Sequence, residues 1–98
     1  MKVNSDMNNV EKEILLITQE ECAEVTQAIS KVFRFGFVAS HNGVSNQAHL
    51  DEEVGDLLCM IHLMIDNGLV NADAVEYAKN AKLSKLKKWS GIFEKVVV

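Results

Sequence analysis

Five acidic side chains in two short stretches have the types and spacing to bind a divalent cation. Glu20, Glu21 and Glu24 lie in the first stretch, and Glu53 and Asp56 lie in the second. Acids three residues apart occupy neighbouring positions on one helix face, so each stretch presents a pair of carboxylates. Oxygen ligands without His or Cys favour Mg²⁺, with Mn²⁺ as a second candidate, over Zn²⁺. Because Mg²⁺ retains positions for water and phosphate oxygens, the pattern points to phosphate-ester chemistry.

The acids coincide with apolar helix faces when each residue is placed at 100° per step. Glu21 falls inside the apolar arc of its helix, Glu24 falls at the edge of that arc, and Glu20 lies towards the polar side. Glu53 and Asp56 project among the methionines and leucines of the second helix. Each helix therefore places a pair of acids on or beside a face that should be buried.

Basic residues near these acids are too few to neutralise them. Lys12 is the only Lys or Arg between Glu11 and Glu24, and none lies between Ala39 and Ala78. An ionised carboxylate taken out of water costs several kcal/mol in a real protein. Any single acid could instead be partly solvated at the edge of its stripe. Four acids in two pairs favour a metal centre over that alternative.

Cations that could contact phosphate groups concentrate in the third helical segment. Lys79, Lys82 and Lys85 belong to a cluster of lysines that holds half of the 10 basic residues. One alternative is that their aliphatic stems pack while the ammonium groups reach water. The functional interpretation is that Lys82, with Lys79 or Lys85, reaches phosphate oxygens near the metal. Lys31 and Arg34, at the end of the first helix, are further candidates.

The acids and lysines must be positioned by three helices. Apolar periodicity predicts helices over Asn9–Phe35, Gln47–Asn67 and Ala72–Trp89, with a loop at Phe37–Asn46. Capping signals mark their ends, namely a capping box at Asn8 and Glu11, N-caps at Ser45 or Asn46 and at Asn71, and stops at Gly36 and Gly68. No strand is expected, and the β-prone Val96–Val98 should fray or pack on a partner chain.

A length of 98 residues suits one domain, spanning 1–98 with a core at about 9–90. The expected fold class is all-α, a bundle of long antiparallel helices completed by oligomerisation. A helix of roughly 27 residues is about 40 Å long, which is too long for a compact monomer. The second helix is apolar on nearly every side along Leu57–Ile65, so several neighbours must bury it. We therefore expect a homodimer or a homotetramer.

Composition excludes several classes of protein. No run of 18 apolar residues occurs, so no membrane span is expected. The start of the chain lacks the apolar segment of a signal peptide, which predicts a cytoplasmic protein. Cys22 and Cys59 are then expected to be reduced, small core residues. A net charge of −4 argues against a nucleic-acid partner.

At this point the motifs resemble a known family. Glu20–Glu24 matches the pattern EExxE, and Glu53–Asp56 matches ExxD. The elements Lys31–Gly36 and Asn80–Leu83 are also similar to family elements. Together they resemble the MazG-like, all-α nucleoside triphosphate pyrophosphohydrolases, over roughly Glu11 to Trp89.

The resemblance implies a fold, a reaction and a set of residue roles. It implies an oligomeric helical bundle that cleaves a nucleoside triphosphate to the monophosphate and pyrophosphate with Mg²⁺, as in nucleotide-pool house-cleaning. The metal ligands it implies are Glu21, Glu24, Glu53 and Asp56, with catalytic roles for Glu24 and for Glu20, which would orient water. Lys82 and Asn80 would contact phosphates. The alternatives are a non-catalytic oligomeric module that binds nucleotide or metal, and a plain interaction module.

Overall fold

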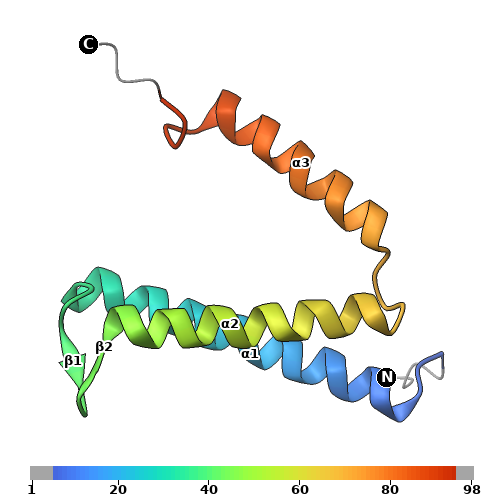
Figure 1. The fold of residues 1–98 in the computed structure, drawn as a ribbon, viewed down its shortest axis with the longest axis horizontal. Coiled ribbons are helices and arrows are strands. Elements are labelled where there is room, and N and C mark those ends of the chain that lie inside the picture. The colour runs from blue at the N-terminus through green and yellow to red at the C-terminus, as the bar shows by residue number, and fades with distance from the viewer. Residues whose placement is uncertain (1–5, 95–98) are drawn as a thin grey trace, which may run out of the picture.

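The computed structural model describes residues 6–94. Three long helices dominate it, α1 (Asn9–Phe35), α2 (Asn46–Asp66) and α3 (Ala72–Trp89), which Figure 1 shows in chain order. The prediction of an all-α fold is thus confirmed. The bounds of α1 and α3 match the sequence prediction, and α2 begins and ends one residue earlier than predicted.

The helix ends follow the predicted capping signals. At the start of α1, the Asn8 backbone N–H donates to Glu11 Oε1 at 3.0 Å, and the Glu11 backbone N–H donates to Asn8 Oδ1 at 2.8 Å. This reciprocal pair satisfies two backbone donors that the helix itself cannot. Ser45 caps α2 and Asn71 caps α3 in the same way, each accepting a backbone N–H through its side chain. Gly36 ends α1 with a φ of 86°, a conformation that favours glycine.

The loop between α1 and α2 contains a short β-hairpin, so the expectation of no strand is wrong here. Strands β1 (Ser40–His41) and β2 (Val44–Ser45) pair antiparallel. The residues between them, Asn42 and Gly43, have φ values of 53° and 81°. Positive φ at both central positions is the signature of a type I′ turn, whose twist matches that of paired strands. The Asn-Gly dipeptide carried this signal in the sequence.

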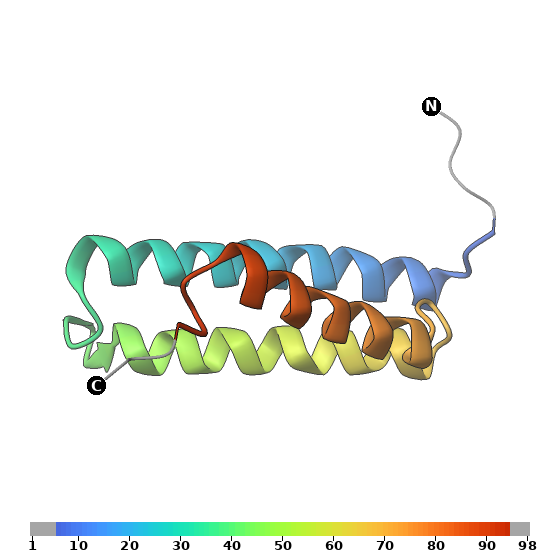
Figure 2. The same cartoon turned by 90° about the horizontal axis from the view of Figure 1, so that it is seen from above.

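Helices α1 and α2 pack side by side and antiparallel, forming a helical hairpin that both views show (Figures 1 and 2). Ile14 and Ala28 are the buried apolar residues of α1, and Met60 is that of α2. Ala28 is 1% exposed. A small side chain at that point allows the helices to approach closely. Among the described residues this core is thin, with no large side chain fully buried.

Helix α3 stands apart from the helical hairpin (Figure 1). In the part of the chain that the structure describes, no residue of α3 is buried. Its Tyr77 and Trp89 are among the exposed large apolar side chains. Cys22 and Cys59 are also exposed in the single chain, so the prediction that they are core residues is wrong at this level. The predicted tail Val96–Val98 lies outside the described residues.

The surface of the single chain is much larger than a monomer of this size should have. It amounts to 8087 Å², whereas a compact chain of this size exposes roughly 5,600 Å². The radius of gyration is 17.5 Å, against about 13 Å for a compact globule of this length. Phe33 at 87% and Leu58 at 50% exposure show that much of the excess is apolar. None of the described helices is long and apolar enough to cross a bilayer.

The exposed apolar surface leads to a prediction about assembly. The excess of roughly 2,500 Å² per chain is on the scale of obligate homodimer interfaces. We expect light scattering at micromolar concentration to give twice or four times the monomer mass. Leu58→Glu should reduce that mass and lower the melting temperature together, because the charge would enter the interface. A folded wild-type protein with monomer mass on dilution would contradict this prediction.

Candidate metal centre

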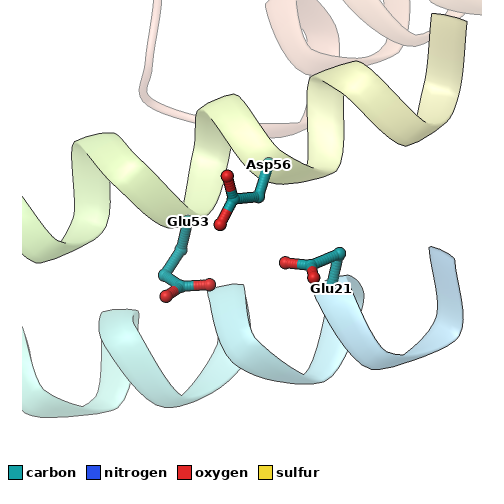
Figure 3. A group of neighbouring side chains, drawn as sticks. All are labelled: Glu21, Glu53 and Asp56. Atoms are coloured by element: carbon teal, nitrogen blue, oxygen red, sulfur yellow. The ribbon is translucent and has the colours of Figure 1, made fainter. Parts of the chain in front are cut away.

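Three carboxylates meet where α1 faces α2. Glu21 extends from α1, and Glu53 and Asp56 extend from α2 towards it (Figure 3). One carboxylate oxygen from each of the three residues lies within 4.8 Å of the other two. Glu53 and Asp56 are separated by three residues, so one turn of α2 presents both carboxylates to the same neighbour. The structure therefore brings together three of the four predicted metal ligands from two helices.

The three acids differ in how far they are exposed to solvent. Glu21 Oε2 is buried and, among the described residues, accepts no hydrogen bond. The side chain of Glu53 is 12% exposed, and Asp56 is exposed. A buried carboxylate oxygen without a donor is costly, because it has lost its water and gained no partner. The group is thus most enclosed at Glu53 and open at Asp56, where solvent or a ligand can enter.

The electrostatics of Glu21 follow from this burial. Desolvation raises the pKa of Glu21 above its usual range, and the charges of Asp56, Glu53, Glu24 and Glu20 raise it further, in that order. All of these causes disfavour the ionised form. A divalent cation would offset them, since it would supply positive charge and a partner for Glu21 Oε2. The all-oxygen donor set therefore fits Mg²⁺ or Mn²⁺.

The remaining predicted acids lie beside the group. Glu24 is one turn further along α1 and is exposed, and Glu20 is exposed as well. Neither belongs to the three carboxylates whose oxygens converge, although both charges act on Glu21. Their predicted roles in metal binding and catalysis stay predictions.

The predicted phosphate contacts are spread over two places. Asn80 and the lysines of α3 are exposed on a helix that stands away from the acids in the single chain (Figure 1). Lys79 Nζ lies 3.0 Å from Glu76 Oε1 on its own helix. Lys31 is at the β-hairpin end of α1, and the Arg34 guanidinium carbon lies 4.9 Å from the centre of the Phe35 ring. Four residues of α3 could reach an acidic group only if α3 moved or if the group belonged to a second chain. These residues are Lys79, Asn80, Lys82 and Lys85.

Sequence reasoning missed one residue of this site, His49. Its Nε2 lies 3.3 Å from Glu53 Oε1, one turn earlier on α2. The signal was the four-residue spacing between His49 and Glu53, which places their side chains together on a helix. A count of Lys and Arg alone omits this histidine partner of the acids.

The comparison with protein families decides the family of this chain. A model described as the MazG nucleotide pyrophosphohydrolase domain matches residues 9–89. The chain belongs to the MazG family. The matched MazG region runs from the first residue of α1 to the last of α3, so it contains all three helices and every acid of the site. Searches of curated proteins and of solved structures found no significant match.

Membership of the MazG family confirms the resemblance proposed from the two acidic motifs. The structure shows why the motifs occur as a pair in this MazG domain. EExxE supplies one acid of the group from α1, and ExxD supplies the other two from α2. The acidic group could hold a divalent cation, in keeping with a nucleotide pyrophosphohydrolase.

The raised pKa of Glu21 leads to a prediction about the metal-free protein. Because the folded-state pKa lies above the ordinary value of 4.5, ionisation of Glu21 destabilises the fold at neutral pH. Glu21→Gln should therefore raise the melting temperature in EDTA at pH 7. The difference from wild type should shrink as the pH falls through the raised pKa, and vanish below about 4.5, where Glu21 is protonated in both folded and unfolded states.

A matched control is Glu13→Gln, which removes an exposed acid from the same helix. This variant should have the melting temperature of the wild type across the same pH range. A Glu21→Gln protein less stable than wild type at neutral pH would show that Glu21 is not a source of unrelieved repulsion.

Proposed function

We propose that this chain is an Mg²⁺-dependent hydrolase that cleaves a ribo- or deoxyribonucleoside triphosphate to the monophosphate and pyrophosphate. The observation that carries the proposal is the buried, unpartnered oxygen of Glu21 beside Glu53 and Asp56. The MazG family supplies the class of substrate. Removal of unwanted nucleotides from the cellular pool is the corresponding biological role. Mn²⁺ could replace Mg²⁺, because both ions take oxygen ligands.

In this proposal Glu21, Glu53 and Asp56 hold the cation, and Glu24 joins them from the exposed edge of α1. When bound, the cation polarises phosphate oxygens and offsets the negative charge of the substrate. Glu24 and Glu20 are exposed to solvent beside the group, where a carboxylate can orient a water and accept its proton. No covalent nucleophile is needed, since phosphoryl transfer depends mainly on positioning and electrostatic stabilisation.

We further propose that the active form is a homodimer or homotetramer. The exposed apolar side chains of α2 and the unburied α3 support this proposal. Assembly would cover α3 and carry its basic residues towards an acidic group. Lys82, with Lys79, Lys85 and Asn80, would then contact the phosphates of the bound nucleotide. Lys31 and Arg34 would approach the same nucleotide from the end of α1.

Removing one ligand gives a direct test of the metal centre. Glu53→Gln keeps the shape of the side chain and removes its charge, so pyrophosphate release should fall by about 100-fold or more, together with Mg²⁺ affinity. Glu13→Gln should leave both unchanged. Calorimetric Mg²⁺ titration and a pyrophosphate assay measure the two effects. Normal turnover by Glu53→Gln would place the cation elsewhere, and Mg²⁺ binding without turnover in wild type would favour the non-catalytic module.

The bond that is cleaved leads to another prediction. If water attacks the α-phosphate, hydrolysis in ¹⁸O-labelled water should place the label in the nucleoside monophosphate, with none in pyrophosphate. Mass spectrometry of the products measures this. Label in orthophosphate, with a nucleoside diphosphate as the other product, would mean attack at the γ-phosphate and a different hydrolase.

A further inference from the structure

We propose that the depression beside the β-hairpin binds the nucleoside part of the substrate and sets the preference for base and sugar. This inference rests on the proposed function and deepens it. The depression lies where the end of α1, the β-hairpin and the start of α2 meet. Its walls are formed by Lys31, Phe35, Ala39, Ser40, His41 and Asn46.

The space is large enough for a small molecule. The main cavity measures about 360 Å³, within the range of about 300–1,000 Å³ for ligand sites. A second cavity of about 250 Å³ adjoins it and shares Lys31, His41 and Asn46. Among the additional residues of the second cavity are His49 and Glu52. The two cavities are therefore parts of one groove that runs along α2.

The groove leads directly to the acidic group. His49 lines the second cavity, and its Nε2 lies 3.3 Å from Glu53 Oε1. From Glu53 back to Asn46 the axis of α2 covers about 10 Å, at 1.5 Å per residue. A nucleotide whose phosphates meet a cation at Glu53 can thus extend its nucleoside along α2 towards Asn46. Along the groove the acidic group comes first. Lys31, which lines both cavities, comes next, and Phe35, which lines the main cavity alone, comes last.

Each part of the groove suits a part of a nucleoside. Phe35 is 59% exposed and lines the main cavity, so its ring can stack on a base there. Stacking is insensitive to the identity of the base, because every base has a flat aromatic face. Ser40 and His41 on β1 can then read the edge of the base by hydrogen bonding. Glu52, in the second cavity, can accept a hydrogen bond from a sugar hydroxyl.

The walls are held in place by hydrogen bonds, as a selective site requires. The buried side chain of Asn46 donates from Nδ2 to the Gly36 carbonyl at 2.9 Å. Its backbone N–H donates to the Ala39 carbonyl at 2.9 Å. These two bonds tie the start of α2 to the first part of the loop, between the end of α1 and β1. Together with the type I′ turn, they hold β1 in a defined position beside Phe35.

The test uses the full-length protein with Phe35→Ala, Phe35→Tyr and His41→Ala. The control is Val38→Ala, which changes a 91% exposed side chain of the same loop that lines neither cavity. For each protein, KM and kcat are measured with a panel of ribo- and deoxyribonucleoside triphosphates. Binding of nucleoside monophosphates and of Mg²⁺ is measured separately by calorimetry, and mass by light scattering.

We expect Phe35→Ala to raise KM about tenfold or more for every base and to weaken monophosphate binding equally. Its kcat, Mg²⁺ affinity and mass should stay unchanged. Phe35→Tyr should keep near-normal KM, because the ring is retained. His41→Ala should change the ranking of bases, and Val38→Ala should change nothing. Unchanged KM and base ranking in Phe35→Ala and His41→Ala would overturn the inference.

Two other outcomes separate this inference from the proposed function. If wild type turns over no nucleoside triphosphate but Phe35→Ala still weakens monophosphate binding, the proposed function fails and the nucleoside site stands. If Glu53→Gln abolishes turnover but the groove variants have wild-type kinetics, the function stands and the nucleoside binds elsewhere. A loss of oligomer mass in Phe35→Ala without a change in KM would identify the groove as an interface between copies.

Discussion

The helical hairpin has to hold three carboxylates between two helices, and this repulsion constrains the rest of the structure. The apolar contacts that oppose it are few, with Ile14, Ala28 and Met60 as the buried apolar residues of the described chain. Glu21 lies between Ile14 and Ala28 on the same face of α1, so the repulsion acts in the middle of the core. A cation bound there would convert the repulsion into attraction between the helices. Cation binding at these carboxylates would therefore stabilise the hairpin.

The same constraint explains what His49 contributes. A metal site is defined as much by what holds its ligands as by the ligands themselves. The imidazole Nε2 of His49 lies 3.3 Å from Glu53 Oε1 on the same helix. The buried Oε2 of Glu21 has no hydrogen-bond partner within residues 6–94. The Glu53 carboxylate thus has a partner on its own helix, whereas a cation would give the buried Glu21 oxygen the partner that it lacks among the described residues.

Features encoded by neighbouring residues could be predicted from the sequence. The capping box at Asn8, the caps at Ser45 and Asn71 and the stop at Gly36 each act over a few residues, so the helix bounds were right to within one residue. The acids could be predicted because ExxE and ExxD spacings are local too. The β-hairpin was missed because strands of two residues are too short to show a periodic pattern. The Asn42-Gly43 turn was the signal in the sequence that indicated them. The prediction that Cys22 and Cys59 are core residues was wrong because residue type and position in a helix do not specify which side chains face the neighbouring helix.

The position of α2 along α1 is the last link between the β-hairpin and the acids. Asn46 is buried and bonded to Gly36 and Ala39, which sets where α2 begins relative to the end of α1. Glu53 is two turns further along that rigid helix, about 10 Å away. A slip of α2 by one residue would move Glu53 and Asp56 by about 1.5 Å and rotate them by 100° away from Glu21. The loop that shapes the groove therefore also sets the position of Glu53 and Asp56 relative to Glu21. If the groove binds the nucleoside as proposed, loop changes compatible with a shared ion are those that preserve the start of α2.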